Sequence, residues 1–145
     1  MTDNRDIHPD FRFYLDFKTT ELAALYRGLR TFVLSICPGA NELLYHTHAL
    51  TSLYSVTEKM SDGFCMIPIY TGHLNLGFNR GTLLPDKQGL LHGTGKLIRH
   101  IPIAEERDYN NVAVGELIEA ALQLALADAE GAAIMHGATI SKIKR

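Results

Sequence analysis

Glycines and cationic side chains gather in residues 88–100, which read QGLLHGTGKLIRH. Loops that hold a nucleotide phosphate follow the spacing G-x-x-x-x-G-K-[ST] between a strand and a helix, because backbone N–H groups and the helix N-terminus bind the phosphate oxygens. Counting back from Gly95 and Lys96, the first glycine of that motif falls on Leu90 and the hydroxyl position falls on Leu97. The segment that follows also predicts a strand instead of a helix. The stretch therefore does not fit a phosphate-binding loop of this type.

The same region favours a simpler site for an anion. Glycines leave backbone amides exposed, and cationic side chains beside them complete a site for a carboxylate or a phosphate. The candidate residues are Arg80, Gly93, Gly95, Lys96, Arg99 and His100. The alternative is structural: the glycines provide positive φ in a turn, while Lys96 and Arg99 are solvated or pair with an acid such as Asp86. The sequence leaves both interpretations open.

Two histidines, His46 and His48, raise the question of metal binding. Alternate residues of a strand point to the same face of a sheet, and neighbouring strands would bring His73 or His100 near them. Such a cluster would suit iron or another divalent metal. No H-x-x-x-H or C-x-x-C motif accompanies these histidines. The alternative is that they are half-buried surface residues.

No set of residues in the sequence predicts catalysis. Cys37 and Cys65 lie inside apolar runs, which is typical of buried thiols and not of a nucleophile or a disulfide framework. No G-x-S-x-G motif occurs, and no acid, base and nucleophile are grouped. We therefore expect a binding function instead of an enzymatic one, and no cofactor unless the metal alternative holds.

Composition limits the class of protein. The chain has 145 residues, 46% hydrophobic and 21% charged, which predicts a single folded domain over residues 1–145. Its net charge of −2 argues against a nucleic-acid partner, although residues 73–100 are locally basic. The first ten residues are polar, and no apolar run approaches the roughly 18 residues that span a bilayer. We therefore expect no membrane partner and a cytoplasmic location.

Hydrophobic periodicity predicts two long helices around a group of strands. One helix begins at Thr19 or Thr20 and ends at the CPGAN stretch, and the other begins after an asparagine cap near residue 111 and ends near Gly131. Between them, ELLYHTHALTSLYSVTE, GFCMIPIY, HLNLGFN and KLIRHIPI predict consecutive antiparallel strands. Residues 11–17 fit either a short helix or a strand.

The predicted fold is α+β: an antiparallel sheet of about four to six strands, with long N- and C-terminal helices packed on one face. The core covers about residues 20–127. Residues 1–19 form a lead-in, and residues 132–145 form a tail.

Residues 74–101 read LNLGFNRGTLLPDKQGLLHGTGKLIRHI and closely resemble the signature of the YdhG-like family, a bacterial domain of unknown function. The matching positions are Gly77, Phe78, Arg80, Gly81, Leu84, Pro85, Asp86, Gly89, Leu90, Leu91, Gly93, Thr94, Gly95, Lys96, Arg99 and His100. The likeness extends more loosely over about residues 20–127, and it departs from the family pattern at residues 45–50. The resemblance implies an α+β fold, and one relative described as a frataxin-like iron chaperone implies a metal-handling alternative.

The sequence therefore predicts a non-catalytic domain that binds an anionic small ligand or a protein partner, either as a monomer or as a homodimer. Frataxin-like handling of iron or another metal is the alternative.

Overall fold

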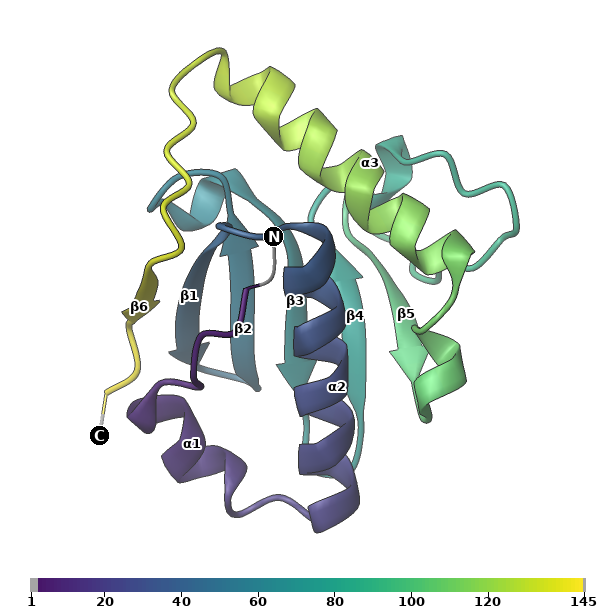
Figure 1. Cartoon of the computed structure of the whole chain (residues 1–145). Coiled ribbons are helices and arrows are strands. Elements are labelled where there is room, and N and C mark those ends of the chain that lie inside the picture. The colour runs from purple at the N-terminus through teal and green to yellow at the C-terminus, as the bar shows by residue number, and fades with distance from the viewer. Residues whose placement is uncertain (1–2, 145) are drawn as a thin grey trace.

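The computed structural model describes residues 3–144 and shows one sheet with three α-helices in front of it (Figure 1). The helices are α1 (Pro9–Leu15), α2 (Thr20–Ile36) and α3 (Val112–Ala129). The strands are β1 (Asn41–His46), β2 (Leu50–Ser55), β3 (Gly63–Ile69), β4 (Leu74–Phe78), β5 (Arg99–Ile103) and β6 (Thr139–Ser141). The predicted α+β class is confirmed.

The six strands lie in the order β5-β4-β3-β2-β1-β6. The first five are joined as antiparallel neighbours, but β6 runs parallel to β1, with Ile140 beside Leu43. The prediction of a purely antiparallel sheet is therefore wrong. After α3 the chain returns past the start of β1 and enters β6 from the same end, so the two strands must run in the same direction.

The terminal segments also differ from the prediction. Residues 9–15 of the lead-in form α1, and β6 lies within residues 132–145, for which we expected a tail. The two long helices are therefore not the terminal elements of the fold. The first predicted strand segment is in fact the hairpin of β1 and β2, because the chain turns at residues 47–49.

The ends of the long helices follow from local hydrogen bonds. The Thr19 hydroxyl oxygen accepts from the Leu22 N–H at 3.1 Å, and the Asn111 side-chain oxygen accepts from the Val114 N–H at 2.9 Å. Both are N-caps, which satisfy N–H groups that the first turn leaves unpaired. α3 ends in left-handed backbone at Glu130, where φ is 50°.

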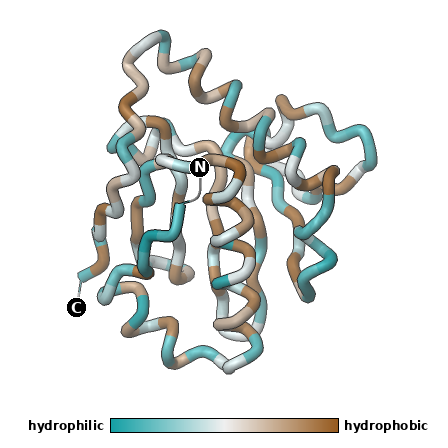
Figure 2. The backbone as a smooth tube through the Cα atoms, viewed as in Figure 1, coloured by the Kyte–Doolittle hydropathy of each residue, from teal (hydrophilic) through white to brown (hydrophobic). Residues whose placement is uncertain are grey.

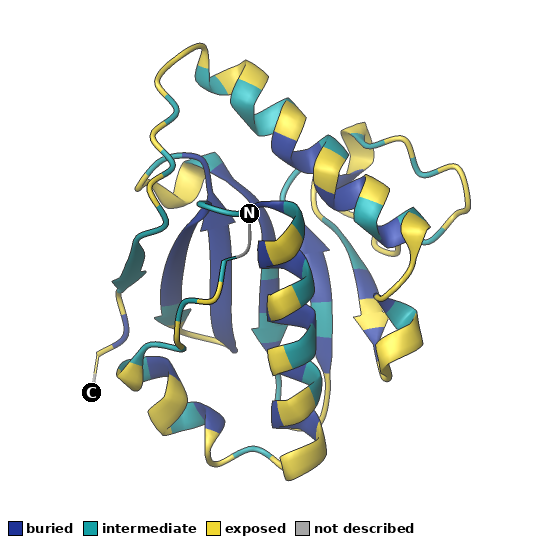
Figure 3. Ribbon diagram, in the orientation of Figure 1, coloured by how far each residue is buried: buried dark blue, intermediate teal, exposed yellow. Residues whose placement is uncertain are grey.

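The core lies between the helices and the facing side of the sheet. Hydrophobic residues concentrate in the strands and along the helices, while the segment before α1 is hydrophilic (Figure 2). In Figure 3 the strands are mostly buried, and each long helix alternates buried and exposed residues around its axis. No helix within residues 3–144 is long and apolar enough to cross a membrane.

A buried ion pair lies inside this core. The Arg30 guanidinium on α2 donates from Nε and Nη2 to the two carboxylate oxygens of Glu42 on β1, at 2.8 and 3.0 Å. The Tyr54 hydroxyl donates to Glu42 Oε2 at 2.8 Å, and the Thr139 hydroxyl of β6 donates to Oε1 at 3.0 Å. One carboxylate therefore joins α2 to three strands.

The remaining donors of Arg30 hold the segment before α1. Nη1 donates to the carbonyl oxygen of Arg5 at 3.1 Å, and Nη2 donates to that of Asp6 at 3.2 Å. Burial by itself lowers the pKa of Arg30, but the hydrogen bonds and the charge of Glu42 outweigh it and raise the pKa above its usual value. Arg30 therefore stays charged in the folded protein.

Asp3 attaches the N-terminal segment to the turn after α2. Its carboxylate accepts from the Arg5 guanidinium and from the Gly39 N–H, the latter at 3.0 Å. Gly39 has φ of 86°, which favours glycine. The hydrogen bond from Arg5 is the main cause that lowers the pKa of Asp3 to about 2, with a smaller contribution from Gly39.

We expect Glu42→Gln to lower the free energy of unfolding by about 3–5 kcal/mol, because it leaves the buried Arg30 cation without a counter-charge. Urea unfolding measures this. The control is Glu116→Gln on the exposed side of α3, which we expect to change stability by less than about 0.5 kcal/mol. Equal effects of the two substitutions would contradict the structural role of the pair.

We expect Asp3→Asn to remove a pH-dependent part of the stability. Because folding lowers the pKa of Asp3 from 3.8 to about 2, its contribution is present above about pH 4 and is lost as the pH falls toward 2. Urea unfolding near pH 6 should show a loss of about 1–2 kcal/mol that shrinks to near zero at pH 2. A difference that stays constant over this range would show that the carboxylate charge is not involved.

Candidate functional site

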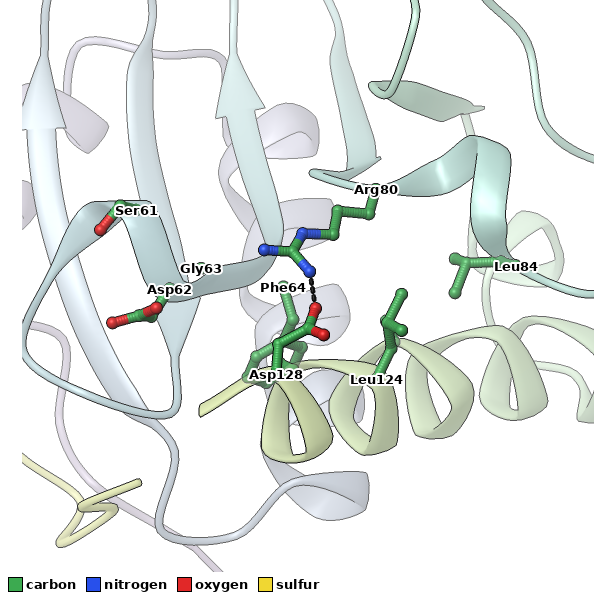
Figure 4. Close-up of a pocket in the computed structure, with 10 residues that line it drawn as sticks. Ser61, Asp62, Gly63, Phe64, Arg80, Leu84, Leu124 and Asp128 are labelled. Carbon is green, nitrogen blue, oxygen red and sulfur yellow. Dashed lines mark ion pairs between the residues drawn. The ribbon is translucent and has the colours of Figure 1, made fainter. Parts of the chain in front are cut away.

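A pocket opens between α3 and the adjoining ends of β3 and β4 (Figure 4). Its cavity volume is only about 20 Å³, and the space between its walls reaches about 350 Å³ when the open solvent in front of it is included. Its apolar lining comprises Phe64, Leu84, Ala121, Leu124 and Ala125, and its polar lining comprises Ser61, Asp62, Arg80 and Asp128. A concave apolar surface with a few polar groups at its edge is the usual form of a small-molecule site.

The spacing of residues on α3 explains one wall of the pocket. Ala121, Leu124, Ala125 and Asp128 follow steps of three and four residues, so they lie along one side of the helix. The two alanines are short and leave space in front of the helix. The helix therefore supplies a shallow apolar wall that ends in a carboxylate.

The opposite wall comes from the adjoining ends of β3 and β4. Phe64 is near the start of β3, and Arg80 follows the end of β4. A single 3-10 turn at Gly81–Leu83 then directs the chain to Leu84. Arg80 projects from this turn across the pocket toward α3 (Figure 4).

Arg80 and Asp128 form an ion pair at the mouth of the pocket. Their side chains are 41% and 44% exposed, so solvent screens the pair and it contributes little to stability. Asp128 lies in the last turn of α3, where the helix dipole disfavours a negative charge. Breaking the Arg80–Asp128 ion pair therefore costs a ligand little free energy. The paired N–H donors of the Arg80 guanidinium match the two oxygens of a carboxylate.

Asp62 contributes less to this mouth than its position suggests. Its Oδ2 accepts from the Thr57 hydroxyl at 2.7 Å, and in Figure 4 the carboxylate lies on the far side of Gly63 from Arg80. We therefore consider Asp128 the acid that controls access to Arg80.

The structure does not bring Arg80 together with the cations of the Gly-rich loop. The Arg99 guanidinium turns back onto its own loop and donates to the carbonyl oxygens of Gly95 at 2.6 Å and Ile98 at 2.8 Å. Lys96 is exposed, and its carbonyl oxygen accepts from the Thr82 hydroxyl at 2.9 Å. The Arg99 side chain therefore makes its hydrogen bonds within the Gly-rich loop, whereas the Arg80 side chain extends toward α3.

Asp86 organises the beginning of this loop. Its carboxylate accepts from the N–H groups of Leu90 and Leu91 at 2.8 and 2.9 Å. Backbone amides, and not Lys96 or Arg99, are therefore the partners that the structure shows for Asp86. Gly89 and Gly93 have φ of 64° and 130°, so the turn uses positive φ at these two glycines.

His100 lies at the other end of the loop, on β5. Its backbone exchanges hydrogen bonds of 2.8 and 2.9 Å with that of His92, and the two rings are 6.0 Å apart. Burial, and next the nearby His92, lower the pKa of His100. Both effects favour the neutral form of the His100 imidazole.

The two histidines considered for a metal lie in different elements. β1 ends at His46, whose ring packs against Tyr14 with centroids 4.4 Å apart, and His48 lies in the exposed hairpin turn. The expectation that both point from one strand to the same face is wrong, because the strand ends before His48. Across residues 3–144, no group of three or more His, Cys, Asp or Glu side chains is placed to hold a metal.

The cysteines are buried free thiols, as predicted. Burial raises the pKa of Cys37 to about 12 and also raises that of Cys65. Both therefore stay protonated at neutral pH and are poor nucleophiles.

Sequence reasoning missed Asp128 as a site residue. The sequence contains one signal for Asp128: it is an acid near the C-terminal end of a helix, on an otherwise apolar stripe. The helix dipole disfavours a negative charge at that end. That signal predicts a nearby cation, but it does not say which one.

We expect Gly81→Ala to destabilise the loop that follows β4. A Cβ at this position would meet the side chain of Arg99 and lie 2.9 Å from its backbone nitrogen, so β5 or the turn would have to move. The expected cost is about 1–3 kcal/mol in urea unfolding. The control is Gly72→Ala, where a Cβ would meet nothing within 4 Å. A loss as small as that of the control would contradict the close packing of the turn on β5.

No protein-family model matches this chain, and no curated protein or solved structure is significantly similar to it. The resemblance of residues 74–101 to the YdhG-like signature therefore stays a prediction.

Proposed function

We propose that this protein is a non-catalytic domain that binds a small organic anion, with an apolar body and one carboxylate, in the pocket between α3 and the sheet. The observation that carries the proposal is the Arg80–Asp128 pair, which lies at the mouth of an apolar pocket. Arg80 is the one cation among the residues that line the pocket. Because its ion pair with Asp128 is weak, the guanidinium stays available to a ligand.

In the proposed complex, the ligand carboxylate takes the place of Asp128 on the guanidinium. The apolar body lies against Phe64 and Leu124 and loses contact with water, which contributes about 25 cal/mol per Å² of apolar surface buried. Arg80 therefore selects the charge of the ligand, and the width between α3 and β3 selects its shape.

In this proposal the Gly-rich loop does not bind the ligand but holds Arg80 in position. Gly81 packs directly on Arg99, and the loop behind it is held by Asp86 and Arg99. These contacts fix the turn that carries Arg80. Binding of a protein partner's C-terminal carboxylate in the same pocket uses the same chemistry. No contact within residues 3–144 favours the iron-handling alternative, since His46 and His48 lie in different elements.

The test uses phenylacetate as the probe and 2-phenylethanol, its neutral counterpart of similar size, as the comparison. We expect phenylacetate to shift the backbone amide NMR signals of Phe64, Ala121 and Leu124, and 2-phenylethanol to bind more weakly. Arg80→Gln should weaken phenylacetate binding about tenfold or more. Asp128→Asn should strengthen it, because Arg80 loses its competing partner.

The control variant is Arg107→Gln, whose side chain is 81% exposed and lies outside the pocket. It should leave the affinity for phenylacetate unchanged. Shifts confined to residues 93–96 would overturn the proposal and assign the anion site to the Gly-rich loop. Weakening by Asp128→Asn would also overturn it, because the pair would then be part of the ligand site itself.

A further inference from the structure

A groove opens between α2, α1 and the segment that precedes α1, and we call it the arginine groove. It is lined by residues 5–7, by Arg12 of α1, and by Arg27, Arg30 and Thr31 of α2, and its cavity volume is about 320 Å³. In Figure 1 the segment before α1 runs along α2 down to α1. The groove shares no lining residue with the pocket at Arg80, so the two are separate sites.

The lining of the arginine groove is mostly cationic. Four of the seven residues that line it are arginines, Asp6 is the one acid among them, and Ile7 is the one apolar residue. A concave surface lined by one sign of charge attracts ligands of the opposite sign. The groove therefore favours an anion with a polar body, whereas the lining at Arg80 is mainly apolar.

Two of the four arginines are available to a ligand. Arg5 and Arg30 each pair already with an acid. Arg12 and Arg27 are exposed, and within residues 3–144 neither guanidinium forms an ion pair or a hydrogen bond. Even when Asp6 is counted, the groove keeps a net positive charge.

Packing holds the two sides of the groove in place. The rings of Phe11 on α1 and Tyr26 on α2 stack with their centroids 4.9 Å apart. The next residue of each helix is the free arginine, Arg12 on α1 and Arg27 on α2. Arg30 donates to two carbonyl oxygens of the segment before α1, at 3.1 and 3.2 Å, and so holds that segment against α2. The backbone of the groove is thus formed before a ligand binds, which lowers the entropy cost of binding.

The donors that line the groove suit a phosphate group. Arg27 and Thr31 are four residues apart, so the Thr31 hydroxyl lies on the same side of α2 as the Arg27 guanidinium. Arg12 faces the groove from the other helix. A phosphate monoester has three acceptor oxygens and close to two negative charges at neutral pH, so it can accept from two guanidinium groups on different sides. A carboxylate has one charge and two oxygens, which one arginine satisfies.

We propose that the arginine groove binds a small phosphate monoester with a polar body, such as a sugar phosphate. Its phosphate lies between Arg12 and Arg27 and accepts from the Thr31 hydroxyl, and its body lies against residues 5–7. The groove is larger than a phosphate group alone and leaves space for this body. Binding here is independent of the carboxylate ligand proposed for the Arg80 pocket.

The test uses glucose 6-phosphate as the probe, with glucose as its neutral counterpart. We expect glucose 6-phosphate to shift the backbone amide NMR signals of Arg12, Arg27 and Thr31, and glucose to leave them unchanged. Arg12→Gln and Arg27→Gln should each weaken binding of glucose 6-phosphate about tenfold or more. Asp6→Asn should strengthen it, because the substitution removes a negative charge that repels the phosphate. Circular dichroism checks that the variants fold, which we expect because these three side chains are exposed.

Two control variants separate this site from the rest of the surface. Arg107→Gln removes an exposed arginine outside the groove and should leave the affinity for glucose 6-phosphate unchanged. Arg80→Gln should also leave it unchanged, although it weakens binding of phenylacetate.

Three results would overturn the proposal. One is the absence of NMR shifts at about 10 mM glucose 6-phosphate. Another is an equal loss of affinity in Arg107→Gln and Arg27→Gln, which would mean that the probe responds only to the overall charge of the protein. The third is an equal affinity for inorganic phosphate, because the body of the ester would then contribute nothing.

Discussion

The buried pair of Arg30 and Glu42 is the interaction on which the rest of the structure depends. Burying two charges is costly, and the cost is offset only when the geometry is good and the remaining donors and acceptors are satisfied. Here the further hydrogen-bond partners of the pair come from three parts of the chain: the segment before α1, β2 and β6. The pair therefore fixes how α2 lies on the sheet and where the two terminal segments meet it.

The position of α2 in turn limits where α3 can pack. α3 lies beside α2 and over β3, so that its apolar stripe faces the sheet. At the C-terminal half of that stripe the side chains are small, and the turn after β4 does not fill the space. The pocket is thus a consequence of helix packing, and Arg80 reaches it because close contact between Gly81 and Arg99 fixes the turn.

The two faces of the sheet have different chemistry. The helix side contains the main core, the buried ion pair and the pocket. On the other face, Leu43 and Leu53 pair across β1 and β2 and are buried outside the main core cluster.

The sequence by itself determined the features that depend on neighbouring residues. It predicted a threonine cap at residue 19 or 20 for α2, an asparagine cap for α3, and buried thiols at Cys37 and Cys65, because caps and apolar runs are local. The structure then identified Thr19 and Asn111 as the caps. Only the tertiary structure decided that β6 joins the sheet parallel to β1, and that Arg80 meets Asp128 and not the loop of Arg99. The partner of a charge and the neighbour of a strand depend on the path of the whole chain, which local periodicity does not record.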